Sequence, residues 1–138
     1  MQECRINDRF CTISLELYSE PVTSKAAKPD EQKISDINIM VFDEYGDLET
    51  SKWIQADGYH GQEFKLIQGR RYTLCACANL GYRIYVPRLE EVEDIIYHLA
   101  YPDEYREGIP MSVVEEISVP EKEEAEIEMK MERLMSKI

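Results

Sequence analysis

Apolar and polar residues alternate in several segments of the chain, which is the pattern of β-strands that bury one face. In the segment 12–18, Ile13, Leu15 and Leu17 fall on one face and polar side chains on the other. Glycine, proline and acidic residues typical of turns separate the alternating segments. The expected strands span residues 12–18, 34–43, 48–55, 64–66, 71–79, 113–119 and 125–135.

One segment has a helical period instead. Between Leu89 and Leu99, apolar residues recur at intervals of three and four, and glutamates occupy the first turn. Pro87 precedes this segment and Pro102 follows it, as expected at the two ends of a helix. We therefore expect a single helix over residues 89–99.

Together these elements predict a mostly β fold, a seven-stranded β-sandwich with one helical insertion at about residues 88–100. A chain of 138 residues suits one domain with its own core. We expect residues 1–11 to form a flexible N-terminal segment and residues 12–138 to form the domain.

The net charge of the chain limits the classes of molecule that it can bind. The formal net charge is −12, from 28 acidic and 16 basic residues. Such a surface repels the phosphate backbone, so we expect no nucleic-acid partner. No apolar run approaches the roughly 20 residues of a membrane-spanning helix.

Residues that commonly carry catalysis or bind metals form no recognisable motif. His60 falls in an expected loop and His98 on the expected helix, without a second histidine at ligand spacing. Adjacent glutamates such as Glu90 and Glu91 are typical of a solvated face, whereas catalytic carboxylates oppose each other across a cleft. We expect no catalytic residue, no cofactor and no metal site.

The four cysteines form two pairs. Cys75 and Cys77 lie on one face of an expected strand, where their Cβ vectors are poorly aimed for a disulfide, so core thiols are predicted, with a metal pair as the alternative. Cys4 and Cys11 can close a small disulfide loop in an oxidising compartment. Two free thiols near a flexible terminus are the other interpretation of this second pair.

Five segments share their order and spacing with a known family. They are CTISLEL at 11–17, INIMVFDEYGDL at 37–48, FKL through YTLCACANLG at 64–81, IPMS at 109–112 and IEMKMERLMSKI at 127–138. In this order they resemble the N-terminal domain of the fimbrillin superfamily, the type V pilus proteins of Gram-negative anaerobes. Within the superfamily, the chain is most similar to the lipoprotein subunits that anchor the fimbria.

The resemblance implies a transthyretin-like β-sandwich, followed in family members by a second β domain that this chain does not contain. It implies a place on the cell surface, in the outer membrane or fimbrium of a Gram-negative bacterium. The implied partners are other pilus subunits and the outer membrane through a lipid anchor. Cys4 and Cys11 are then candidates for lipidation or for a disulfide.

The sequence is consistent with two functions. In the first, the domain assembles fibres by β-strand addition, in which a strand of a neighbouring subunit completes an open sheet edge. The candidate strand-exchange residues lie on the first and last strands, although they also suit a plain core. They are Ile13, Leu15, Leu17, Ile127, Met129 and Met131.

The alternative is a surface module that binds glycan or protein. Tyrosines gather around the expected helix, where exposed rings would stack on a ligand and buried rings would pack the helix onto the sandwich. These candidates are Tyr82, Tyr85, Tyr97, Tyr101 and Tyr105.

Overall fold

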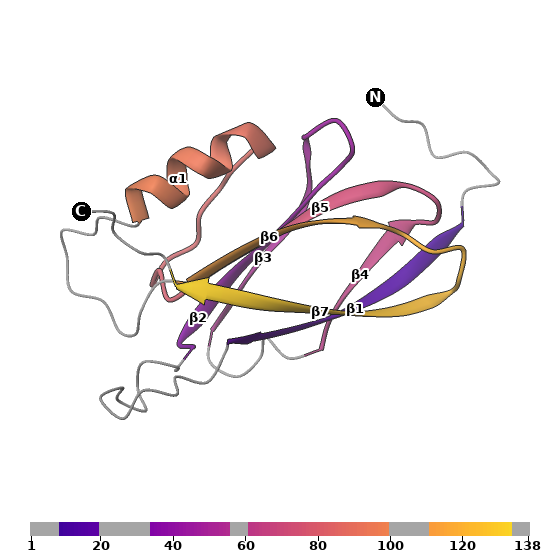
Figure 1. The fold of residues 1–138 in the computed structure, drawn as a ribbon, viewed down its shortest axis with the longest axis horizontal. Helices are drawn as coiled ribbons and strands as arrows, with labels where there is room; N and C mark the ends of the chain where they lie inside the picture. The colour runs from indigo at the N-terminus through magenta and orange to yellow at the C-terminus, as the bar shows by residue number, and fades with distance from the viewer. Residues whose placement is uncertain (1–8, 20–33, 56–60, 100–110, 134–138) are drawn as a thin grey trace.

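The computed structural model describes residues 9–19, 34–55, 61–99 and 111–133 (Figure 1). Its strands are β1 (Phe10–Ser19), β2 (Asp36–Phe42), β3 (Leu48–Gln55), β4 (Gln62–Ile67), β5 (Arg71–Ala78), β6 (Met111–Ser118) and β7 (Glu124–Arg133). The helical insertion is a 3-10 turn (Leu89–Glu91) that continues into α1 (Val92–Leu99). All seven expected strands and the helix are confirmed, and residues 1–8 of the expected N-terminal segment lie outside the described residues.

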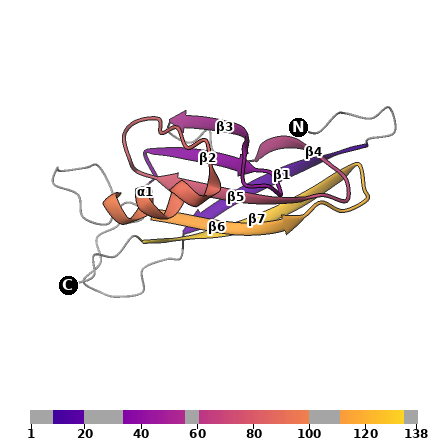
Figure 2. The same cartoon turned by 90° about the horizontal axis from the view of Figure 1, so that it is seen from above.

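The strands form one sheet in the order β3-β2-β5-β6-β7-β1-β4, which folds over into two layers (Figures 1 and 2). One layer holds β3, β2, β5 and β6, and the other holds β7, β1 and β4. Neighbouring strands are antiparallel except β1 and β7, which run parallel from Thr12 opposite Glu124 to Ser19 opposite Met131. The fold is therefore the expected β-sandwich with a helical insertion.

The main core lies between the two layers. β1 contributes Ile13, Leu15 and Leu17, all essentially inaccessible to solvent, and β2 and β5 supply residues such as Ile39 and Leu74 from the other layer. Alternate residues of a strand point to opposite faces, so the burial of one face against this core accounts for the alternation in segments such as 12–18. Burial of side chains of this size stabilises the fold by about 1.5–3 kcal/mol each.

A second, smaller core covers the outer face of β2 and β5. Met40 and Phe42 of β2 and Cys75 and Cys77 of β5 point away from the main core and are also buried, because the chain after β5 and the start of α1 fold over them (Figure 2). Both faces of β2 are thus covered, which explains why all seven of its residues are buried, whereas the start of β5 stays more exposed. The buried members of this core are Met40, Phe42, Cys75, Cys77, Leu80, Val86 and Val92.

Buried polar side chains attach the covering segment to β2. The Asp36 carboxylate, 4% exposed, accepts hydrogen bonds from Trp53 Nε1 at 2.9 Å and from the Gly81 main-chain N–H at 3.0 Å. Asn38 donates from Nδ2 to the Tyr82 carbonyl at 2.9 Å and accepts from the Ile84 N–H at 3.0 Å. Because each group meets a partner, these side chains can be buried without the usual desolvation penalty.

Candidate functional site

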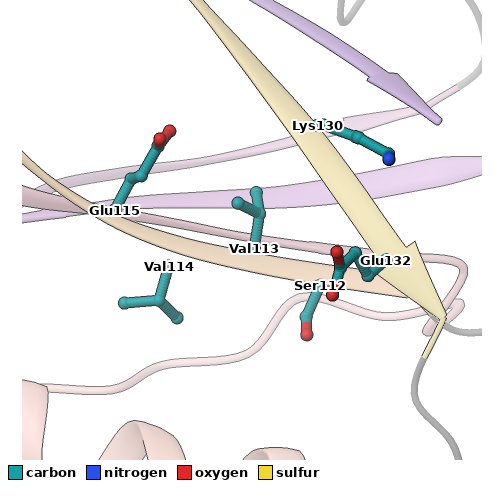
Figure 3. Close-up of a pocket in the computed structure, with 6 residues that line it drawn as sticks. All are labelled: Ser112, Val113, Val114, Glu115, Lys130 and Glu132. Carbon is teal, nitrogen blue, oxygen red and sulfur yellow. The ribbon is translucent and has the colours of Figure 1, made fainter. Parts of the chain in front are cut away.

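One opening in the sandwich lies between β6 and β7. These strands pair only at Met111 with Arg133 and Ser112 with Glu132. Beyond these two pairs the strands separate, and a cavity of about 440 Å³ lies between them (Figure 3). It is lined by Ser112, Val113, Val114, Glu115, Lys130 and Glu132.

Main-chain groups of β6 point into this opening. Val119 donates its N–H to the Arg70 carbonyl and accepts from the Gly69 N–H, both at 2.9 Å, so both of its polar groups face the end of β5. Successive residues of an extended strand turn these groups to opposite sides. The N–H and C=O groups of Val114 and Glu116 therefore point away from β5 and toward β7.

The same alternation applies to β7. The Glu123 carbonyl accepts from the Thr12 N–H at 2.8 Å, which directs the main-chain groups of odd-numbered β7 residues toward β1. Those of Glu126 and Glu128 consequently face β6. Two strand edges thus border one opening, each with main-chain donors and acceptors that the pairing of β6 and β7 leaves unused.

Both ends of the opening are closed. At one end stand the two residue pairs between β6 and β7. At the other end, the side-chain amide of Gln68 donates to the Lys122 carbonyl at 2.8 Å and to the Phe10 carbonyl at 3.2 Å. These bonds fix the connection between β6 and β7 to the other layer, so the opening is a bounded slot with fixed walls.

The two faces of β6 differ at this slot. Val113 and Glu115 point to one side of the strand, and Ser112 and Val114 point to the other (Figure 3). Val113 and Ile117 are half-buried and pack against the main core, which identifies their side as the inner face. Val114, on the outer face, is 44% exposed.

The opposite edge of the sandwich is closed by a lysine. β3 and β4 are the outermost strands of the sheet. Lys52 of β3 donates from Nζ to the Glu63 carbonyl of β4 at 2.9 Å and to Gln62 Oε1 at 3.3 Å. Its ammonium also lies 4.5 Å from the centre of the Phe64 ring. A lysine in this position discourages strand pairing at an edge, so the slot between β6 and β7 is the better candidate for a partner strand.

The predicted strand-exchange residues lie mainly in the main core. Ile13, Leu15 and Leu17 are buried, and β1 pairs with β4 on one side and β7 on the other. A partner strand would have to displace a neighbour of β1 to reach them. On β7, which borders the slot, Met129 and Met131 are buried and Ile127 is half-buried. An exchange role for these six side chains stays a prediction.

The cysteines are partly described. Cys11 is a buried free thiol, and burial raises its pKa above the ordinary value. Cys4 lies outside the described residues, so its lipidation stays a prediction. Cys75 and Cys77 are buried free thiols of the second core, which confirms the prediction of core thiols. The hydrogen bond with Cys77, together with burial, raises the pKa of Cys75 well above its ordinary value.

The proposed tyrosine surface is visible only in part. Tyr82 and Tyr85 are 48% and 73% exposed. The side chain of Tyr97 and the whole of Tyr101 and Tyr105 lie outside what the structure describes, as do His60 and the side chain of His98. Stacking of these rings on a ligand therefore stays a prediction.

A second cavity, of about 720 Å³, lies between α1 and the outer face of β5 and β6. It is lined by Thr73, Leu89, Glu90, Val92, Glu93, Val114 and Glu116. The charged residues of this lining are all acidic. Its apolar residues belong largely to the contact between the helical segment and the sheet. The lining of this cavity therefore reflects the packing of the helix on the sheet and provides no arrangement of groups for catalysis.

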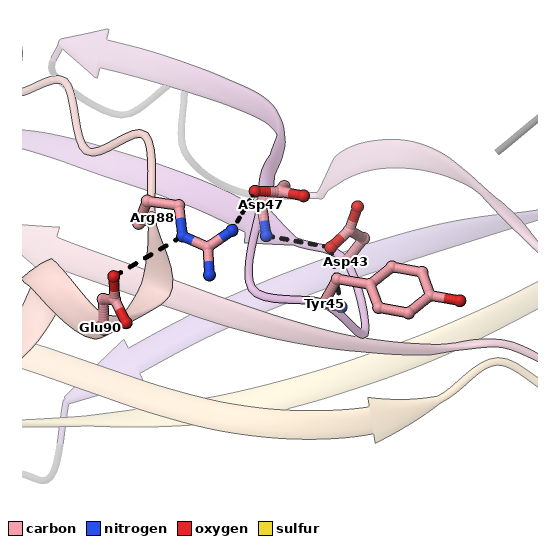
Figure 4. A network of polar contacts seen from close by, with 5 residues as sticks. All are labelled: Asp43, Tyr45, Asp47, Arg88 and Glu90. Atoms are coloured by element: carbon pink, nitrogen blue, oxygen red, sulfur yellow. Dashed lines mark hydrogen bonds and ion pairs between the residues drawn. The ribbon is translucent and has the colours of Figure 1, made fainter. Parts of the chain in front are cut away.

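A polar network holds the beginning of the helical segment against the turn between β2 and β3 (Figure 4). Asp43 Oδ1 accepts from the N–H groups of Tyr45 at 2.9 Å and Asp47 at 3.0 Å, which stabilises the turn. Arg88 forms an ion pair with Asp47, and its Nε lies 3.8 Å from Glu90 Oε1. These contacts position α1 and do not form a reactive site.

One feature of the sequence indicates the slot, although the alternation of apolar and polar residues alone did not reveal it. The inner face of β6 follows the row 111, 113, 115, 117 and 119, in which the only charged residue is Glu115. Its Cα pairs with that of Leu74, a fully buried residue of the main core. A carboxylate in an otherwise core-facing row indicates that the layer opposite does not cover that position.

Within the described residues, no helix has the length and apolar character needed to cross a membrane. That same part of the chain contains no group of three or more histidine, cysteine, aspartate or glutamate residues arranged to hold a metal ion.

Solved structures with this fold include fimbrial proteins. The tip fimbrial protein Mfa3 of Porphyromonas gingivalis matches 91% of this chain and 48% of its own, with 12% identity and a TM-score of 0.54. The fimbrial anchor protein Mfa2 of the same species matches 89% and 50%, with 13% identity and a TM-score of 0.52. A proposed polysaccharide-binding protein of Bacteroides thetaiotaomicron matches 89% and 47%, with 12% identity and a TM-score of 0.58.

At these identities the likeness concerns the fold, and the chain spans about half the length of each solved relative. No curated protein sequence matches the chain significantly. The family model of the major fimbrial subunit protein (FimA) matches residues 12–126, which is most of the chain and includes most of β1 and all of β2 to β6. The chain therefore belongs to the major fimbrial subunit protein (FimA) family.

Proposed function

We propose that this chain is a domain of a cell-surface fimbrial subunit or anchor, and that it joins a neighbouring subunit by β-strand addition in the slot between β6 and β7. Membership of the fimbrial family supports the assembly role. The observation that carries the mechanism is the short pairing of β6 with β7, which ends after Ser112 and Glu132.

The slot has what an added strand requires. Val114 and Glu116 on one wall, and Glu126 and Glu128 on the other, direct main-chain donors and acceptors into it. Each hydrogen bond formed there contributes about 0.5–1.5 kcal/mol. Because β6 and β7 are antiparallel, a strand between them would run antiparallel to one wall and parallel to the other.

Apolar contacts would add to these hydrogen bonds. Val113 and Ile117 of β6, and Ala125 and Ile127 of β7, are half-buried at the margin of the main core. An added strand whose apolar residues face inward would complete their burial, at about 25 cal/mol for each Å² removed from water. Such a partner strand should alternate apolar and polar residues, with its apolar face toward the core.

A proline substitution tests the mechanism. Proline at 114 removes a main-chain donor from the slot, whereas the β5 side of β6 keeps its hydrogen bonds. The full-length protein with Val114→Pro should disappear from fibres sheared from its own cells, while Val114→Thr, which keeps the N–H and the branched side chain, should remain in them. Thermal unfolding of the purified domain verifies that both variants fold. Equal incorporation of the two folded variants would contradict strand addition at this slot.

We also propose that the full-length protein is held at the outer membrane by a lipid on a cysteine near its N-terminus, with Cys4 as the candidate in this chain. The fimbrial family supports a cell-surface location, and the lipid itself rests on the resemblance to anchor subunits. Mass spectrometry of the N-terminal peptide from membrane fractions tests this proposal. An unmodified Cys4 in membrane-bound protein would exclude that site.

A further inference from the structure

The inner wall of the slot contains a charge where the fold would suit an apolar residue. Val113 and Ile117 flank Glu115 on the same face of β6, and all three lie opposite core residues of β5. Glu115 is nevertheless exposed, because β7 does not cover it. Among the residues that the structure describes, its carboxylate has no hydrogen-bond or ion-pair partner.

An added strand would change the surroundings of this carboxylate. It would pair beside β6, so that one of its inward-facing side chains stands next to Glu115 and shields this carboxylate from water. A buried carboxylate that lacks a partner is strongly destabilising, whereas one that accepts charge-assisted hydrogen bonds is tolerated. The strand that enters must therefore bring a donor to this point, and a cation is the donor that compensates the charge.

The charges around the slot favour the same kind of partner. Of the three charged side chains that line the cavity, Glu115 and Glu132 are acidic and Lys130 is basic. The outer face of β7 adds Glu126 and Glu128, and the chain as a whole has a net charge of −12. A field of this sign steers a basic segment toward the slot and repels an acidic one.

We propose that the occupant of the slot is a basic extended segment of another protein chain, with a lysine or arginine that faces inward opposite Glu115 and apolar residues two positions before and after it. The apolar residues contact Val113 and Ile117, and the cation pairs with the carboxylate. Glu115 thereby selects among partner strands, because a wholly apolar strand would bury its charge without compensation. This inference rests on strand addition at the slot.

The test uses peptides of about ten residues, in which valine alternates with serine or threonine and one inward position varies. Lysine, norleucine or glutamate occupies that position, and norleucine gives an uncharged side chain of similar length. Binding to the domain is measured by titration, together with hydrogen exchange at the amides of Val114 and Glu116.

The lysine peptide should bind the unmodified domain about tenfold more tightly than the norleucine peptide, as expected for one charge-assisted hydrogen bond, and the glutamate peptide should bind most weakly. Glu115→Leu should reverse the preference between lysine and norleucine. Glu116→Gln is the matched control, because it removes the same charge from the neighbouring residue on the opposite face, and it should leave the preference in place.

The outcomes separate the two proposals. If lysine and norleucine peptides both protect the slot amides with equal affinity for every variant, strand addition stands and selection by Glu115 is wrong. If no peptide protects these amides in any variant, the slot does not accept a strand and both proposals fail. Thermal unfolding of each variant ensures that a loss of binding reflects the slot and not the fold.

Discussion

Asn79 offers a sharp test of how the covering segment is attached. It follows β5 and has a φ of 67°, in the left-handed region that most residues avoid. Its Oδ1 accepts from the Ser35 N–H at 2.8 Å and the Ser35 hydroxyl at 3.1 Å, and its own N–H donates to the Asp36 carbonyl at 2.9 Å. Asn79 thus turns the chain from β5 toward Leu80 and the second core.

Two substitutions separate these contributions. Asn79→Gly keeps the freedom to adopt a positive φ but loses the side-chain acceptor, which leaves the Ser35 N–H without its partner and should lower the free energy of unfolding by about 2 kcal/mol. Asn79→Ala loses the acceptor and also strains the backbone, so we expect a loss of about 3 kcal/mol. For a domain of this size, 1 kcal/mol corresponds to about 3 °C in melting temperature.

Urea unfolding, monitored by circular dichroism, gives the free energy of unfolding of both variants. Ser35→Ala is the control with a smaller expected effect. That control keeps the Ser35 N–H and removes only the contacts of the hydroxyl, to Asn79 Oδ1 at 3.1 Å and to Asp36 Oδ1 at 3.5 Å. It should lower the free energy of unfolding by less than about 1 kcal/mol. Equal losses for glycine and alanine would show that the left-handed conformation contributes nothing. An Asn79→Gly domain as stable as the parent would refute the assigned role of the hydrogen bonds.

Three further predictions concern the edges and the thiols. Lys52→Met should change the free energy of unfolding by less than about 1 kcal/mol. It should nevertheless promote self-association through the exposed edges of β3 and β4, which light scattering detects. Lys65→Met, the control, should not promote self-association. Cys75 and Cys77 should resist alkylation in the folded domain, because both side chains are fully buried and a reagent cannot reach their sulfur atoms. Mass spectrometry should find modification of these two only after unfolding, and rapid native labelling would contradict their burial. Arg88→Gln should lower the melting temperature only slightly, because the ion pair of Arg88 with Asp47 is exposed. Salt screens such a pair, so the decrease should be smaller in high salt. A decrease in melting temperature that salt does not change would indicate a packing role for Arg88.

The sequence predicted the elements better than their arrangement. Strand β3 begins and ends where it was expected, at Leu48 and Gln55. The helix was expected from Leu89, and its first residues form a 3-10 turn before α1 begins at Val92. Local periodicity distinguishes a helix from a strand and indicates which face is buried, but it does not indicate which elements become neighbours.

The position of β1 could not be read from its own residues. Alternation in 12–18 fits a strand at an edge or in the middle of a sheet equally well. The parallel pairing of β1 with β7 joins the two ends of the chain and makes β1 an interior strand, which moved the candidate site from β1 to the free side of β7. Pairing over such a sequence separation depends on the whole set of contacts, and no local pattern encodes it.

The slot itself had a partial signature in the sequence. Glu115 interrupts a row of apolar residues, and this interruption marks a place where the second layer is absent. The direction of the Val114 and Glu116 main-chain groups, however, follows from the hydrogen bonds of Val119 with the β5 end. Only the paired structure shows which side of β6 remains open.

Hydrogen exchange in assembled fibres tests the central claim most directly. The amides of Val114 and Glu116 should exchange rapidly in the isolated domain, because their N–H groups face the slot. In fibres of the full-length protein the same amides should be strongly protected, while those at the outer edge of β3 keep their exchange rates. Equal exchange of Val114 and Glu116 in the isolated domain and in fibres would contradict strand addition between β6 and β7.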